Sequence, residues 1–410
     1  MHILLIADGR SAITRNWLHM LNGLDHEVSL VSTYPCEPPH GAELVGVLPV
    51  AFSSLAGGQV KIHQRPSTLN HGPDWKRKLL NTFRPLLLTM RSYFAPLGLG
   101  KFQKQLAALV DKTQPDLVHV LRIPFEGMLT TALPDGLPVV VSIWGNDLTL
   151  HARSSFFMSA RTRQTLDRAD GLLADASRDI RLAAQWGFKA GAPSLVVPGS
   201  GGLDLEHIRQ VLKHAQSFKD FDIPTDRAVI VNPRGFRPGS VHQDTFFKSI
   251  PLVLRQRADA FFVCCGMQAQ PQAEKWVRNL HLEKHVLLLP YLPQEQLWQL
   301  FGQALIYVSL SSHDGTPNTL LESLACGCFP VAGDIESLRE WITSGVNGLL
   351  VDPHDPQQAA DALLQALSDD RMRLTASRHN LSLVSERADM MNVRKLMQGF
   401  YQQVLALPRS

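Results

Sequence analysis

The chain of 410 residues lacks several features that would place it in common classes of protein. No apolar run approaches the roughly 18 residues of a membrane-spanning helix, so none is predicted. The first apolar run is broken at Asp8 and Gly9, too soon for a signal peptide. Five cysteines, an odd number without zinc-ligand spacing, predict reduced thiols in a cytoplasmic protein.

A nicotinamide-type dinucleotide site is also not indicated. Such a site needs a G-x-G-x-x-G turn directly after a strand. The dense glycine cluster at residues 199–202 lies instead in a Pro/Gly-rich segment, residues 196–204, which is typical of a hinge. A dehydrogenase is therefore disfavoured.

Short apolar segments alternate with helical patterns in both halves of the chain, which predicts an α/β fold with parallel sheets covered on both faces. Two Rossmann-like domains facing across a cleft, at residues 1–198 and 203–389, follow from this pattern, and ligands are expected beyond the carboxyl ends of the strands. The predicted strands are residues 3–7, 28–32, 117–121, 139–143, 171–174, 228–232, 260–265, 286–289, 305–310, 329–332 and 348–351, with helices at 13–24, up to 130 and up to 184 among those between them.

The most informative segment is residues 310–350, where an apolar strand runs through a polar loop into a helix. Thr316 is predicted to cap this helix, Pro317 to be its first residue and Gly327 to end it. Backbone N–H groups and the positive helix end then meet at one place, which favours an anion. Asp314 and Glu322 lie on either side of it, as expected for a phosphate that carries a polyhydroxyl group, such as a nucleotide-sugar.

This segment resembles the donor-binding signature of the retaining GT-B glycosyltransferases of family 4. That signature places two acidic residues eight apart around G-x-P-N-x-L-L-E, followed by A-x-G-x-P-V. The matching residues are Asp314, Gly315, Pro317, Asn318, Leu320, Leu321, Glu322, Ala325, Gly327, Pro330 and Val331. Asp314 is one methylene shorter than the glutamate usual in the family.

The resemblance implies roles for residues of the second half. Glu322 would bind the ribose diol and Asp314 the transferred sugar, while Arg234 would stabilise the leaving diphosphate. The lysine that follows this arginine in the family is missing, and Arg237 is the nearest substitute. Backbone N–H groups for the diphosphate would come from Gly315, Thr316, Asn318 and Thr319, and base contacts from Gly266 and Tyr291. For each of these a structural alternative exists: helix capping, turn chemistry or a solvated charge.

In the first half, Gly9 follows the first strand where the family has a glycine-rich loop that touches the donor phosphate and the acceptor, which implies a catalytic role for Gly9. The stretch SIWGNDL corresponds to T-x-H-G-x-D, so that Trp144 replaces a histidine and Asp147 is kept. His119 and Arg122, at the end of a predicted strand, complete the expected acceptor or sugar pocket. Trp144 is equally compatible with a role as a core aromatic residue, and a histidine at a strand end, such as His119, is more often a structural group.

The predicted reaction is transfer of a hexose from a UDP-sugar, UDP-glucose or UDP-GlcNAc, to a glycan or lipid-linked acceptor in polysaccharide biosynthesis. The resemblance implies retention of configuration, no metal, and a last helix at about 390–410 that packs on the N-terminal domain. A non-catalytic nucleotide-sugar sensor and a sugar-nucleotide 2-epimerase of the same fold remain alternatives.

Residues 75–110 form a basic segment with seven Lys or Arg, no acidic residue and several aromatic residues. This composition suits peripheral contact with anionic lipid on the inner face of the cell membrane, but also ordinary helices with solvated positive faces. No nucleic-acid motif accompanies the charge, so a nucleic-acid partner is not predicted.

Overall fold

The computed structural model describes residues 1–51, 93, 95–214, 221 and 223–408. The chain divides into two compact units. The N-terminal unit comprises Met1–Gly201 and Arg394–Ser410, and the C-terminal unit comprises Gly202–Val393. The boundary falls inside the glycine-rich segment 196–204.

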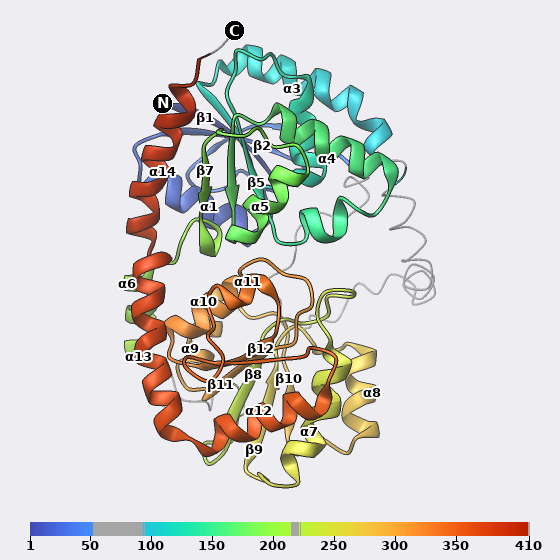
Figure 1. The fold of residues 1–410 in the computed structure, drawn as a ribbon, viewed down its shortest axis with the longest axis vertical. Coiled ribbons are helices and arrows are strands. Elements are labelled where there is room, and N and C mark those ends of the chain that lie inside the picture. The colour runs from blue at the N-terminus through green and yellow to red at the C-terminus, as the bar shows by residue number, and fades with distance from the viewer. Residues whose placement is uncertain (52–92, 94, 215–220, 222, 409–410) are drawn as a thin grey trace. The chain divides into compact units, whose positions relative to one another are not determined.

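The N-terminal unit contains a parallel sheet of seven strands in the order β3-β2-β1-β4-β5-β6-β7. Figure 1 shows α3 and α4 on one side of this sheet and α1 and α14 on the other. The strands are β1 His2–Ala7, β2 Glu27–Ser32, β3 Glu43–Val47, β4 Leu117–Val120, β5 Val139–Ile143, β6 Gly171–Ala174 and β7 Ser194–Val196. The helices are α1 Ala12–Asn22, α3 Leu99–Thr113, α4 Phe156–Arg168, α5 Ser177–Gln185 and α14 Met390–Leu405, which begins in the C-terminal unit.

The C-terminal unit contains a second parallel sheet, of six strands, in the order β10-β9-β8-β11-β12-β13. Its strands are β8 Ala228–Asn232, β9 Ala260–Cys264, β10 Val286–Leu288, β11 Ile306–Ser309, β12 Phe329–Gly333 and β13 Leu349–Val351. Its helices are α6 Leu205–Lys213, α7 Gln243–Leu254, α8 Pro271–Asn279, α9 Gln294–Phe301, α10 Asn318–Ala325, α11 Glu336–Arg339, α12 Pro356–Ser368 and α13 Asp370–Arg387.

The strands are almost entirely apolar because both faces of each sheet are covered. In the C-terminal unit, Ile230 and Phe262 enter a core with α7 and α12, whereas their neighbours Val229 and Val263 enter a second core with α9, α10 and α13. Side chains alternate along a strand, so a strand buried on both faces has no polar positions to alternate with. This explains why continuous apolar runs, rather than alternating ones, mark the strands.

The predicted fold class is confirmed, since two Rossmann-like parallel sheets are present. Two edge strands, β3 and β7, are absent from the prediction because neither contains a buried residue. The helix predicted up to Thr130 is present but irregular: Ile123–Gly127 is a π-helical turn with non-helical angles at Pro124 and Phe125, and a short 3-10 helix, Thr130–Ala132, follows it. None of the described helices has the length and apolarity needed to cross a bilayer.

Most of the basic segment 75–110 lies outside the described residues, which resume there with Tyr93 and then Ala95. The predicted contact with anionic membrane therefore remains a prediction.

Candidate functional site

Two loops at the carboxyl ends of neighbouring strands form the predicted donor site in the C-terminal unit. The loop after β8 is bonded to the loop after β11: the N–H of His242 donates to the carbonyl of Leu310 and the N–H of Ser312 to the carbonyl of Ser240, each at 2.9 Å. Because β8 and β11 are adjacent in the sheet, residues about 80 positions apart in the sequence are brought together.

Arg234 and Asp314 form an ion pair across these two loops. The guanidinium of Arg234 donates to Asp314 Oδ2, and the N–H of Gly315 donates to Asp314 Oδ1 at 3.1 Å. The Arg234 side chain is 7% exposed, and its Nε is buried without a hydrogen-bond partner in the described part of the chain. Asp314 thus serves as the counter-ion of Arg234 in this structure, and one donor group of that arginine is still available.

Arg237 adds a second positive charge beside this pair. The positive charge of Arg234 and then burial lower the pKa of Arg237, while Asp314 opposes the shift. Among the described residues Arg237 has no ion pair, so two guanidinium groups share one carboxylate. The site therefore carries an excess of positive charge, which an anionic ligand would neutralise.

The start of α10 differs from the prediction. Pro317, not Thr316, is the N-cap, and no side chain caps this helix. Thr316 precedes this cap, and its Oγ1 accepts a hydrogen bond from Trp341 Nε1 at 3.0 Å. Ser337 Oγ donates a hydrogen bond to the carbonyl of Asp314 at 2.8 Å and so stabilises the loop that precedes α10. An uncapped helix start beside two arginines favours an anion.

Glu322 lies in the second turn of α10 and is 4% exposed. Its Oε1 accepts a hydrogen bond from Gln294 Nε2 of α9 at 2.7 Å. Burial raises the pKa of Glu322 to about 7, although the hydrogen bond from Gln294 opposes the shift. A carboxylate held in this way accepts further hydrogen bonds, such as those of a diol.

The two residues predicted to contact the base lie against each other. Gly266 has φ +70°, and a Cβ there would come within 2.7 Å of the Tyr291 ring. Gly235 has φ +58°, and a Cβ there would come within 2.8 Å of the Tyr291 hydroxyl. Tyr291 is 58% exposed, so these glycines leave room for an aromatic ring that solvent can reach.

The N-terminal unit contains a cavity of about 430 Å³ at the carboxyl ends of β1 and β4. The order of the sheet reverses at these two strands, which is where ligands bind in open parallel sheets. We call this cavity the acceptor cavity, after the role predicted for this region. The residues that line it are Ala7, Asp8, Ser11, Thr14, Tyr34, Val50, Leu121, Arg122, Pro124, Phe125, Glu126, Trp144, Leu150, His151 and Met158.

Two of the four residues predicted for a sugar pocket, Arg122 and Trp144, line this cavity. The guanidinium of Arg122 lies 4.8 Å from the centre of the Trp144 ring and donates to Asp147 Oδ1 at 2.9 Å. Asp147 is fully buried and also accepts from the backbone N–H groups of Ile123 and Trp144. Asp147 therefore orients the two loops that carry Arg122 and Trp144, rather than contacting a ligand itself.

The prediction that His119 faces a ligand is wrong. His119 is completely buried, with its Nε2 2.8 Å from Ser142 Oγ and its Nδ1 2.9 Å from the Tyr401 hydroxyl of α14. Burial lowers the pKa of His119 to about 3, so it stays neutral. Its side chain points to the face of the sheet that α1 and α14 cover, because alternate residues of a strand face opposite ways.

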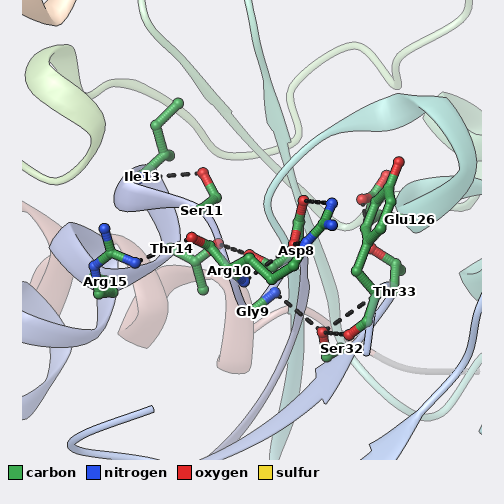
Figure 2. Close-up of polar contacts among 11 residues, drawn as sticks. Asp8, Gly9, Arg10, Ser11, Ile13, Thr14, Arg15, Ser32, Thr33 and Glu126 are labelled. Atoms are coloured by element: carbon green, nitrogen blue, oxygen red, sulfur yellow. Dashed lines mark hydrogen bonds and ion pairs between the residues drawn. The ribbon is translucent and has the colours of Figure 1, made fainter. Parts of the chain in front are cut away.

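Gly9 packs closely at the end of β1. Its N–H donates to Ser32 Oγ at 3.0 Å, and a Cβ there would come within 2.5 Å of Cys36 Sγ. Figure 2 shows this contact between Gly9 and Ser32. The structure thus explains the glycine by packing, and its catalytic role remains a prediction.

Three residues of these sites escape the sequence motifs. Gln294 orients Glu322, and Tyr34 and Glu126 line the acceptor cavity. Glu126 is a single carboxylate in the otherwise apolar stretch IPFEGML, and this isolation is a signal that points to a buried functional group. Gln294 and Tyr34 give no comparable signal.

Two family models match the chain: Glycosyl transferases group 1 over residues 214–382 and Glycosyl transferase 4-like over residues 70–176. The D-inositol 3-phosphate glycosyltransferase of Thermobispora bispora is 27% identical over 223 residues, 52% of this chain and 51% of that protein. The O-antigen chain mannosyltransferase B of Escherichia coli is 32% identical over 109 residues, 27% of this chain and 26% of that protein. The chain thus matches about half of the first relative's length and about a quarter of the second's.

Among solved structures, Anabaena Alr3699/HepE in complex with UDP and glucose superposes with a TM-score of 0.66. The sequence identity is 15%, and the match covers 98% of this chain and 99% of that one, so it supports the fold. The match of one family model in each half, together with this fold and the motif from Asp314 to Val331, leads to one assignment. The chain belongs to the family-4-like glycosyltransferases of the GT-B fold.

Proposed function

We propose that this protein transfers a hexose from a nucleoside diphosphate sugar to a hydroxyl group of a saccharide-containing acceptor, with retention of the anomeric configuration. The bond between the anomeric carbon and the diphosphate oxygen breaks, and a bond from the acceptor oxygen to that carbon forms on the same face. The acceptor proton passes to the departing diphosphate oxygen. This balance needs no further reactant.

The observation that carries the proposal is the excess positive charge beside the uncapped start of α10. Arg234 and Arg237 share the single carboxylate of Asp314, and Arg234 Nε is buried without a partner in the described part of the chain. A diphosphate would supply the missing negative charge and accept from these donors. Negative charge grows on the diphosphate as it leaves, so the two arginines would stabilise the transition state more than the bound donor. This difference is what accelerates the transfer.

The donor is proposed to be UDP-linked, with UDP-glucose and UDP-GlcNAc as the first candidates. Support comes from the buried carboxylate of Glu322, suited to a ribose diol, and from Tyr291, suited to a base. A protein of the same fold has been crystallised with UDP and glucose. No metal is proposed, because two guanidinium groups can neutralise the diphosphate.

The first experiment removes one charge of the donor site. We expect Arg237→Ala to weaken binding of UDP-glucose by about 10- to 100-fold, since a charge-assisted hydrogen bond contributes roughly 1.5–3 kcal/mol. Arg278→Ala is the matched control, because Arg278 is a largely exposed arginine of α8 in the same unit. Affinity is measured by calorimetry in EDTA, with UDP-GlcNAc and GDP-mannose alongside.

Turnover separates the alternatives. Arg234→Ala should lower kcat by more than it lowers donor affinity, because its contribution is greatest in the transition state. Donor binding without transfer or hydrolysis would support a sensor, and release of a 2-epimeric sugar would support an epimerase. Equal affinity of Arg237→Ala and wild type, or a requirement for added Mg²⁺, would contradict the proposed diphosphate site.

A further inference from the structure

The acceptor cavity has three carboxylates close to two guanidinium groups. Asp8 and Glu126 line it, and Asp147 lies directly behind Arg122. Arg122 is the one arginine or lysine among the described residues that line the cavity, and Arg10 stands beside Asp8. Each guanidinium is thus already paired with a carboxylate, and Glu126 is a second acid close to Arg122.

The two ion pairs are geometrically fixed. Arg10 Nε lies 3.0 Å from Asp8 Oδ1 and Arg10 Nη2 lies 3.1 Å from Asp8 Oδ2, as Figure 2 shows. Arg10 also lies 3.8 Å above the ring of Tyr34. A bidentate pair held against an aromatic ring does not release its arginine readily. Neither Arg10 nor Arg122 is therefore a free cation for a phosphate.

Glu126 is held at the cavity by a strained turn. Phe125 has φ 68° and ψ −55°, a rare conformation for a residue with a side chain, and Gly127 N–H closes the turn onto the carbonyl of Arg122 at 3.0 Å. Glu126 is 6% exposed, and its Oε1 accepts from Thr33 Oγ1 at 2.9 Å. Figure 2 shows Glu126 beside Thr33 near the end of β1. Strain of this kind persists where the position of a side chain matters.

Much of the remaining wall is apolar and aromatic, and the polar residues Ser11, Thr14 and His151 also line it. Tyr34, Phe125 and Trp144 contribute rings, and Leu150 and Met158 contribute aliphatic surface. Aromatic rings suit the C–H faces of a sugar, and carboxylates accept hydrogen bonds from its hydroxyl groups. The volume of about 430 Å³ is within the range of small-molecule sites.

We propose that this cavity accepts an uncharged saccharide residue, and that Glu126 and Asp8 exclude its phosphorylated counterparts. The inference rests on the proposed function and specifies its acceptor. It separates this chain from the relative whose name contains D-inositol 3-phosphate. A phosphate in this cavity would face carboxylates without an unpaired cation, and like charges brought together cost binding energy.

The experiment uses the full chain and matched pairs of probes. Methyl glucoside, methyl mannoside, N-acetylglucosamine and inositol are each compared with a monophosphate of the same sugar or cyclitol. Binding is followed by saturation-transfer NMR without donor, and transfer is followed with the donor found by calorimetry. We expect at least one uncharged probe to bind roughly tenfold or more tightly than its phosphate partner.

Glu126→Gln tests the source of this preference, because it removes the charge and keeps the size of the side chain. We expect the ratio between uncharged and phosphorylated probes to fall toward one, together with about a tenfold loss of affinity for the uncharged probe. Asp135→Asn is the matched control, since Asp135 is a highly exposed acid of the same unit. It should leave the ratio unchanged.

Preference for a phosphorylated probe, binding by no uncharged probe, or an unchanged ratio in Glu126→Gln would each overturn the inference. These results are distinct from failure of the proposed function. If UDP-sugars neither bind to the protein nor are turned over, the proposed function fails whatever the acceptor cavity binds.

Discussion

At the scale of single residues, the buried carboxyl of Glu322 links pH to both stability and donor binding. Its pKa is raised to about 7 because it is buried, whereas an unfolded chain would titrate it near 4.5. The folded protein therefore holds a proton that the unfolded chain releases between these two values. Stability from the neutral carboxyl is complete below about pH 4.5 and is lost as pH rises through about 7.

We expect Glu322→Gln to be more stable than wild type at pH 8 and to differ little from it at pH 5, because glutamine resembles the protonated acid. The difference at pH 8 is on the order of 3 kcal/mol, from 1.36 kcal/mol per pKa unit. The same variant should bind UDP-glucose more weakly at pH 8, since the ionised carboxylate accepts from the ribose diol. Unfolding and calorimetric titrations at both pH values measure these effects.

The control is Glu283→Gln, which changes an exposed acid of the same unit. This control should change the free energy of unfolding only slightly, and by the same amount at both pH values. If Glu322→Gln is destabilised at pH 8 as much as at pH 5, then the carboxylate makes favourable contacts that outweigh its burial, and the pH argument is wrong.

Sequence reasoning places Arg234, Asp314 and Glu322 in one site. The motif fixes the spacing of Asp314 and Glu322, and Arg234 follows a predicted strand whose carboxyl end lies at the same edge of the sheet. It does not give the ion pair between Arg234 and Asp314. That contact depends on how two loops 80 residues apart are joined, through bonds such as that from Ser312 N–H to the Ser240 carbonyl. Glu126 is missed for a similar reason, since a strained turn rather than a helix carries it.

At the scale of elements, the donor loop after β11 is set by close packing against the end of β12. A Cβ at Gly333 would lie 2.2 Å from the carbonyl oxygen of Ser311, three residues before Asp314. Backbone atoms cannot move aside as a flexible side chain can. Gly333, the last residue of β12, thus fixes the loop that follows the neighbouring strand β11.

We expect Gly333→Ala to weaken UDP-glucose binding about tenfold or more and to destabilise the C-terminal unit by roughly 1–3 kcal/mol, because an added methyl group displaces the loop. Gly399→Ala, inside α14, is the control: nothing lies within 4 Å of its Cβ. It should stabilise the protein by about 0.5–1 kcal/mol and leave donor affinity unchanged. Normal affinity in Gly333→Ala would show that the loop adapts.

Every strand that is buried along its whole length was predicted, and the two strands that were missed, β3 and β7, contain no buried residue. Residues 139–143, 171–174 and 228–232 coincide with β5, β6 and β8, each of which is buried along its whole length. The edge strand β3 has no buried residue, so its pattern carries little information. The start of α10 was misplaced by one residue: Pro317 rather than Thr316 is the N-cap, and the hydroxyl of Thr316 accepts a hydrogen bond from a tryptophan 25 residues away.

At the scale of the whole molecule, each unit has buried cores of its own, and α14 supplies part of the core of the N-terminal unit. Phe400 of α14 is 4% exposed and lies beside Gly171 of β6. Phe247 of α7 is completely buried in the C-terminal unit and lies 5.0 Å from the Trp276 ring, measured between centroids. Separate cores favour separate unfolding transitions.

We therefore expect Phe400→Ala and Phe247→Ala to lower different transitions in scanning calorimetry. Each substitution removes a buried ring, which costs about 3–5 kcal/mol and lowers the unfolding temperature by roughly 10 °C. UDP should raise the transition that Phe247→Ala lowers, because a ligand stabilises the unit that binds it. Leu396→Ala, at a half-exposed position of the same helix as Phe400, should change little. If both phenylalanine variants lower one common transition, the two units unfold together, and the expectation of separate transitions is wrong.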